Sequence, residues 1–179
     1  MFKNKLIRYS TFAMLVAVLA YFFIENFSGN SASSTEISIS NPQAYLEKIN
    51  SDRESKDELF RSGPDSPILD KDAFHGLHYF KPNLEYRVVA NVVPYTGSDK
   101  VFISVLFRDE TSGKETYGGG RYLDYPISEL KNNTLILDFN EAYNPYCAYQ
   151  EDYACPVPPK ENTLPLSIFA GEQYEEAMH

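Results

Sequence analysis

The fold class is decided by two stretches in which apolar side chains alternate with others, YRVVANV at residues 86–92 and VFISVLF at residues 101–107. Every second side chain of such a stretch lies on the same face of a strand, so each stretch predicts a strand with one apolar face. Residues 94–100 separate the two and contain Gly97 and Ser98, which predicts a turn. The same alternation recurs in LILDF at 135–139 and in LPLSI at 164–168. Strands at this spacing predict a mostly β domain, either a small antiparallel sandwich or a partly open barrel.

An N-terminal helix is expected before these strands. Asn41 followed by Pro42 is a good helix start, and Gly63-Pro64 is a stop signal. The apolar positions are sparse around a charged centre at residues 52–58, so we expect the helix to dock by its ends or to stay mobile. No other long helical pattern interrupts the strands, which argues against a parallel sheet. The expected organisation is an N-terminal segment at 1–30, a flexible linker at 31–40, a helix at 41–63 and a β-rich domain at 64–175.

The first thirty residues have the layout of an export signal, with cations before the apolar run from Phe12 to Ile24. A helix of this run reaches about 20 Å, less than the roughly 30 Å hydrocarbon core of a membrane. Extension of the span at both ends, from Tyr9 to Phe27, gives the missing length but includes Glu25 and Asn26. The segment therefore predicts either a cleaved signal peptide or an uncleaved membrane anchor, and the aromatic residues at its end favour the anchor. In both cases the remaining chain is exported, to the periplasm or the cell envelope.

The amino-acid composition argues against some classes of binding partner. The chain of 179 residues suits one domain and carries a formal net charge of −9, which becomes −11 without residues 1–30. A domain this acidic is not expected to bind nucleic acid or to lie flat on an anionic membrane. Aromatic residues make up 15% of the chain, with 14 Tyr and no Trp. Many of the tyrosines fall between residues 117 and 153.

This tyrosine-rich block holds the candidate site. Alternation in LILDFN at 135–140 places Asp138 and Asn140 on the same face, about 7 Å apart. A buried Asp138 needs a cation, for which Arg121 and Arg108 are the candidates. We favour an ion-paired structural cluster, because such networks resemble functional sites. The alternative is a site for a small polar ligand such as a sugar, built from Tyr117, Arg121, Tyr122, Asp138, Asn140, Tyr143, Asn144 and Tyr146.

Two further motifs have structural and functional interpretations. Asp109, in RDETSG at 108–113, is expected to accept hydrogen bonds in a turn rather than to act in catalysis, and a strand should begin at Glu115. The triplet Gly118-Gly119-Gly120 before Arg121 resembles a phosphate cradle but lacks the strand-to-helix context. Within a strand-like segment it favours a bulge or a close approach of two backbones.

Cys147 and Cys155 are expected to form a disulfide in an exported chain. A redox-active pair would favour the closer Cys-x-x-Cys spacing. A zinc site would need two more ligands, and the gap between His75 and His78 differs from the usual spacing. We therefore expect no metal and no cofactor.

Several long motifs resemble the bacterial domain of unknown function 1684. They are FRDETSGKETY at 107–117, GRYLD at 120–124, LDFNEAYNP at 137–145, CAY at 147–149, CPVPPKEN at 155–162 and AGE at 170–172. With SP at 66–67 and FHGL at 74–77, the resemblance covers about residues 45 to 173. It implies an exported or envelope-associated bacterial protein with a β-rich domain, and it implies no activity.

The function expected from the sequence is therefore the binding of a small polar ligand or an envelope partner by an exported, anchored domain. The alternative is an envelope enzyme of the hydrolase or lyase type. It would use Asp138 or Asp109 as acid or base and Arg121 as an electrostatic clamp.

Overall fold

The computed structural model describes residues 39–92 and 102–174. The predicted export segment at residues 1–30, most of the predicted linker and the predicted turn at 94–100 lie outside these residues. Within the two described ranges, no helix has both the length and the apolar character that crossing a membrane requires.

The expected helix is observed as α2 (Pro42–Ser62). At its start the Asn41 side chain accepts a hydrogen bond from the backbone N–H of Ala44 at 3.0 Å, which satisfies one of the free donors of the first turn. At its end the N–H of Gly63 donates to the carbonyl of Leu59 at 2.8 Å. Local capping chemistry therefore fixes both ends of α2.

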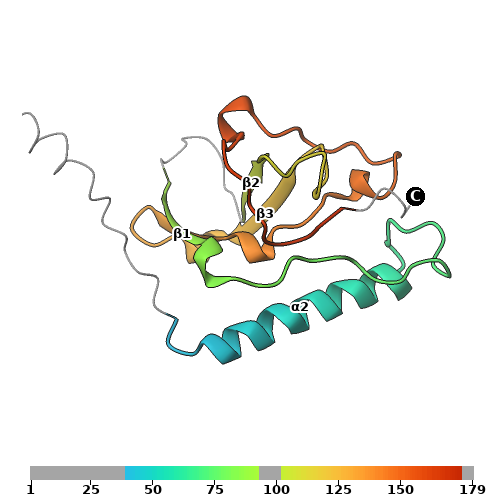
Figure 1. Ribbon diagram of the computed structural model, residues 1–179, viewed down its shortest axis with the longest axis horizontal. Helices are drawn as coiled ribbons and strands as arrows, with labels where there is room; N and C mark the ends of the chain where they lie inside the picture. The colour runs from blue at the N-terminus through green and yellow to red at the C-terminus, as the bar shows by residue number, and fades with distance from the viewer. Residues whose placement is uncertain (1–38, 93–101, 175–179) are drawn as a thin grey trace, which may run out of the picture. The chain divides into compact units, whose positions relative to one another are not determined.

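α2 docks along its length, so the expectation that it docks only by its ends or stays mobile is wrong. Ile49 and Phe60 are buried, as an apolar pattern requires. The charged centre also makes contacts, because Arg53 Nη1 donates to the carbonyl of Phe80 at 2.9 Å and the N–H of Leu77 donates to Asp57 Oδ1 at 3.2 Å. These bonds hold α2 against the segment that returns from the helix towards β1 (Figure 1).

The strands form two separate two-stranded antiparallel sheets. β1 (Arg87–Asn91) pairs with β4 (Thr134–Asp138), with Val89 opposite Ile136. β2 (Phe102–Phe107) pairs with β3 (Arg121–Pro126), with Val105 opposite Leu123. Short 3-10 turns precede, connect or follow these strands, at Leu84–Tyr86, Ile127–Glu129, Phe139–Glu141, Tyr146–Ala148 and Lys160–Asn162. The described residues are therefore partly β, and their strands form no closed barrel.

Two strand predictions are wrong. Residues 164–168 form no strand, because Pro165 has no N–H and the N–H of Ile168 donates to the Asp109 carboxylate instead of to a neighbouring strand. The strand expected from Glu115 begins only at Arg121, since residues 110–116 are held in turns by bonds such as the one from Thr116 N to the carbonyl of Thr111.

Two apolar clusters form the interior. The larger lies where the sheets meet and includes Phe107, Leu123, Leu135 and Phe139, with the rings of Phe107 and Phe139 packed edge to face at 5.0 Å. The second packs against the C-terminal half of α2 and consists of Phe60, Ile68, Phe74, Leu77, Ala148 and Tyr149.

Candidate functional site

Asp109 and Arg121 form a sealed ion pair inside the domain. Arg121 Nη2 lies 3.1 Å from Asp109 Oδ2, and Arg121 is only 1% exposed. Asp109 also accepts from the N–H of Ile168 at 2.8 Å and from the hydroxyls of Thr111 at 2.7 Å and Ser112 at 3.2 Å. Arg121 also donates to the carbonyl oxygens of Ile168 and Ala170. Burial lowers the pKa of the Arg121 guanidinium, and the Asp109 carboxylate opposes that shift.

Asp138 pairs with a different arginine from the two predicted candidates. Arg87 Nε lies 2.8 Å from Asp138 Oδ2, because the register places Arg87 opposite Asp138 across β1 and β4. The same carboxylate accepts from the Tyr45 hydroxyl of α2 at 2.9 Å and from the Asn140 side chain at 2.9 Å. Asp138 and Asn140 are thus neighbours, but through the 3-10 turn Phe139–Glu141 that Asp138 caps and not through strand alternation, because β4 ends at Asp138. Burial first, and then the charge of Asp138, raise the pKa of Tyr45.

A third buried cluster surrounds Glu172, which is not among the site residues predicted from the sequence. Glu172 is fully buried, and its Oε2 lies 2.7 Å from Lys56 Nζ of α2 and 2.8 Å from the N–H of Asn144. Tyr149 donates its hydroxyl to Glu172 Oε1, and burial raises the Tyr149 pKa well above its ordinary value. The Asn144 side chain donates to the Tyr149 hydroxyl at 3.2 Å. A lone carboxylate near the end of a chain gives no pattern by which this role could be predicted.

The predicted tyrosines do not converge on one site. Tyr117 donates to the carbonyl of Cys147 at 3.3 Å, and Tyr122 donates to the carbonyl of Pro156. Tyr143 donates to the exposed carboxylate of Asp124, while Tyr146 packs on the rings of Phe60 and Tyr153. The predicted ligand residues are therefore divided among several clusters.

The glycine triplet lies in a turn just before β3. A Cβ atom at Gly120 would lie 2.6 Å from the carbonyl oxygen of Phe107, and Gly120 has a φ of +99°. The interpretation as a close backbone approach is therefore confirmed at Gly120. Cys147 and Cys155 form the predicted disulfide, with their Cα atoms 6.1 Å apart. In residues 39–92 and 102–174, no group of three or more His, Cys, Asp or Glu side chains is placed to hold a metal ion.

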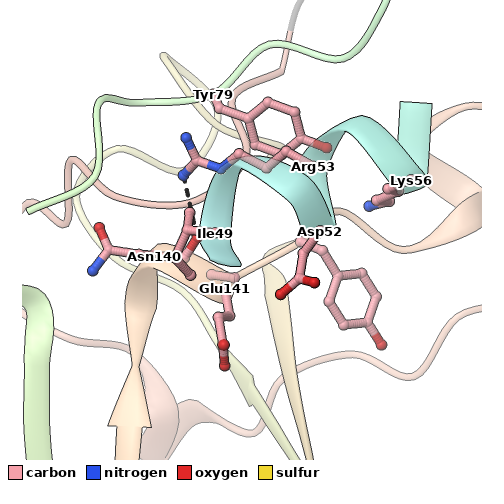
Figure 2. A pocket seen from close by; sticks show the side chains of 9 residues that line it. Ile49, Asp52, Arg53, Lys56, Tyr79, Asn140 and Glu141 are labelled. Atoms are coloured by element: carbon pink, nitrogen blue, oxygen red, sulfur yellow. Dashed lines mark hydrogen bonds between the residues drawn. The ribbon is translucent and has the colours of Figure 1, made fainter. Parts of the chain in front are cut away.

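A pocket of about 170 Å³ lies between α2 and the residues that follow β4 (Figure 2). We call it the α2 pocket. Its residues come from α2, from the return segment and from the turn after β4, and they are Ile49, Asp52, Arg53, Lys56, Tyr79, Asn140, Glu141, Ala142 and Tyr143. Of the predicted ligand residues, Asn140 and Tyr143 line it. A cavity of about 150 Å³ can hold benzene, so the α2 pocket suits one small ring or a molecule of similar size.

Arg53 and Tyr79, which line the α2 pocket, each have one buried polar atom without a partner. The guanidinium of Arg53 lies 4.5 Å from the centre of the Tyr79 ring and donates to the carbonyls of Phe80 at 2.9 Å and Asn140 at 3.2 Å. Figure 2 shows the Arg53 guanidinium beside the Tyr79 ring. Arg53 Nε and the Tyr79 hydroxyl are both buried and have no hydrogen-bond partner. Burial lowers the pKa of Arg53 and raises that of Tyr79.

The sequence contains a signal for this pocket in its polar residues, which the pattern of apolar residues does not show. Ile49, Asp52, Arg53 and Lys56 follow one another at intervals of three, one and three residues, which places them on one face of a helix. A search for chemistry-bearing residues at helical spacing would have grouped them.

Comparison with known proteins gives a family and a structural relative. Residues 97–173 match the family described as protein of unknown function (DUF1684). The solution NMR structure of an uncharacterized protein of Haloarcula marismortui is 28% identical with a TM-score of 0.59, and the match covers 73% of this chain and 95% of that one. No curated protein matches the chain. The resemblance predicted from the motifs is thus confirmed over residues 97–173, which match the DUF1684 family model.

Proposed function

We propose that this chain is an exported domain that binds a small polar ligand in the α2 pocket. The unpartnered Arg53 Nε and Tyr79 hydroxyl carry the proposal. A buried polar group without a partner costs about 1–3 kcal/mol, so a ligand that supplies an acceptor gains the energy that the free protein forgoes.

The rest of the pocket fits the same kind of ligand. Ile49 and Ala142 supply apolar surface, and the tyrosines at 79 and 143 supply aromatic surface with a hydroxyl at one end. Asp52 and Glu141 add acceptors at the exposed side. Apolar and aromatic walls with a few placed polar groups are typical of sites for small molecules.

Export is supported by two independent features. Residues 1–30 have the order of a signal or anchor, with cations before an apolar run. The disulfide between Cys147 and Cys155 is of the kind that persists in oxidising compartments and is rare in the cytosol. We therefore propose a location in the cell envelope or periplasm, with residues 1–30 as signal or anchor.

The enzyme alternative has no comparable support. Arg121 and Asp109 are enclosed and bonded to each other and to backbone groups, with only Arg121 Nε left without a partner, and Asp138 belongs to another cluster. A clamp and an acid for catalysis would have to meet at a place that substrate can reach.

A thermal-shift screen of the full chain in mild detergent tests the proposed function. The probes are glucose, galactose, glucuronate, galacturonate, lactate and N-acetylglucosamine. A ligand at a hundred times its dissociation constant adds about 2.7 kcal/mol, a shift in melting temperature of about 5–11 °C. We expect at least one probe to give such a shift.

Two variants locate the binding. Tyr79→Phe removes a hydroxyl that bonds nothing in the free protein, so it should weaken binding without lowering stability. Arg61→Gln changes an exposed cation of the same helix and should leave binding unchanged. If no probe shifts the melting temperature, or if both variants bind as the parent does, the proposed function is wrong.

A further inference from the structure

We infer that the ligand of the α2 pocket carries a carboxylate, and that Arg53 is the cation which recognises it. This inference rests on the proposed function and adds the chemical class of the ligand. It follows from the ion pairs around the pocket. The other cations there lie within ion-pair distance of a carboxylate, and the guanidinium of Arg53 does not.

The other cations near the α2 pocket have carboxylate partners. Lys48, at the rim, lies 2.8 Å from Asp52 and 3.0 Å from Glu141, so that it serves both rim carboxylates. Lys56 lies 2.7 Å from the buried Glu172. The rim and one end of the pocket are therefore electrostatically satisfied.

Arg53 differs, since no carboxylate of residues 39–92 and 102–174 lies within ion-pair distance of it. Arg87 and Arg121, by contrast, have Asp138 and Asp109. Arg108 also lacks a carboxylate, but it does not line the pocket. Arg53 is thus a partly buried cation at the pocket that no carboxylate of the described residues contacts directly, although Glu172 and Asp138 act on its charge from farther away.

None of the groups that bond to Arg53 carries a negative charge that would neutralise its guanidinium. The carbonyls of Phe80 and Asn140 accept from Nη1 and Nη2, and the Tyr79 ring covers the guanidinium, but carbonyls and rings contribute only partial charges. The Nε donor is still without an acceptor. A carboxylate would provide both the acceptor and the opposite charge, and charge-assisted bonds to guanidinium are among the stronger hydrogen bonds in proteins.

The remaining groups favour a hydroxylated carboxylate. The oxygens of Asp52 and Glu141 at the rim accept hydrogen bonds, which suits hydroxyl donors at the other end of the ligand. The two tyrosines flank a space of about 170 Å³, enough for one six-membered ring. A hexuronate, with one carboxylate and several hydroxyls on a ring, has this distribution.

Two matched pairs of probes test the inference on the full chain: glucuronate with glucose, and galacturonate with galactose. One hydrogen bond to a charged group corresponds to about a ten- to hundredfold change in Kd. We expect each acid to bind at least about tenfold more tightly than its neutral partner. We also expect high salt to reduce that ratio, because salt screens the attraction between charges.

Variants assign the effect to Arg53. Arg53→Gln should remove the preference for the acid, Arg53→Lys should retain part of it, and Arg61→Gln should leave it unchanged. If Arg53→Gln does not fold, the N–H signal of Arg53 Nε in the parent replaces it. This NMR signal, assigned by its loss in Arg53→Lys, should move on titration with glucuronate and not with glucose, because only the acid brings a carboxylate to Nε.

The outcomes separate the inference from the proposed function. Neutral sugars that bind as tightly as their acids would overturn the inference and leave the proposed function intact. Acids that bind without moving the Nε signal, and equally in Arg53→Lys and the parent, would also overturn it. If none of the probes binds, the proposed function fails as well.

Discussion

Replacement of Asp109 by Asn should show that the pair with Arg121 is structural. Asparagine has nearly the same shape but no charge, so the guanidinium of Arg121 stays buried without its counter-charge. The asparagine NH₂ group must also face a donor, because Asp109 Oδ2 accepts from both Arg121 and the N–H of Ile168, and Oδ1 accepts from Thr111.

The magnitude follows from the burial of both partners. Their side chains are 1% and 0% exposed, so solvent does not screen the loss. Removal of one partner from a buried pair costs about 3–5 kcal/mol, a large fraction of the 5–15 kcal/mol of a typical domain. The melting temperature of a chain this size should fall by about 6–20 °C.

Urea unfolding followed by circular dichroism measures the change, since the chain has no Trp. Asp72→Asn is the matched control, because Asp72 is exposed. A double variant, Asp109→Leu with Arg121→Met, should cost less than the sum of its single changes, because it leaves no unpaired charge. A loss no larger than that of the control, or strictly additive single changes, would refute the structural interpretation.

Three other predictions concern stability. Reduction of the Cys147–Cys155 disulfide should cost about 2.6 kcal/mol in urea unfolding, the entropy of a nine-residue loop, and an unchanged midpoint would contradict it. Gly171→Ala should lower the melting temperature more than Gly113→Ala. Both glycines have a positive φ, but an added Cβ atom would lie 2.6 Å from a carbonyl oxygen at Gly171 and 3.9 Å from the nearest atom at Gly113. Equal losses would show that crowding is unimportant. Burial raises the pKa of Tyr45 in the folded protein, so as pH rises the unfolded chain loses the hydroxyl proton first. The free energy of unfolding should therefore fall as pH rises above about 10, and it should fall less in Tyr45→Phe. A free energy that does not change with pH in the parent would contradict this prediction.

Local signals in the sequence predicted local structure well. The start and end of α2 depend on Asn41, Pro42 and Gly63, whose effects extend only a turn, so they could be identified without tertiary information. The disulfide followed from two cysteines and an export signal. Strands β1, β2 and β4 followed from alternation, whereas residues 164–168 form no strand because Pro165 has no N–H and the N–H of Ile168 donates to the Asp109 side chain.

The site depended on pairings that no local pattern contains. The cation beside Asp138 is Arg87 and not Arg121, and only the register of β1 with β4 reveals it. The α2 pocket could not be predicted from the apolar positions of α2, because these are sparse around its charged centre at residues 52–58. Arg53 and Lys56 there dock through hydrogen bonds and charge, which an apolar periodicity does not detect.

The segment around residues 168–172 determines when this domain can fold. Its carbonyls hold Arg121, and Glu172 closes on Lys56 across a separation of 116 residues. Contacts between such distant residues form late, after the entropy of closing a long loop has been overcome. During synthesis on the ribosome, the contacts of α2 and Arg121 with this segment therefore form only after residues 168–172 have been made. A nascent chain that stays open until then keeps the form in which it can be threaded through a translocation channel.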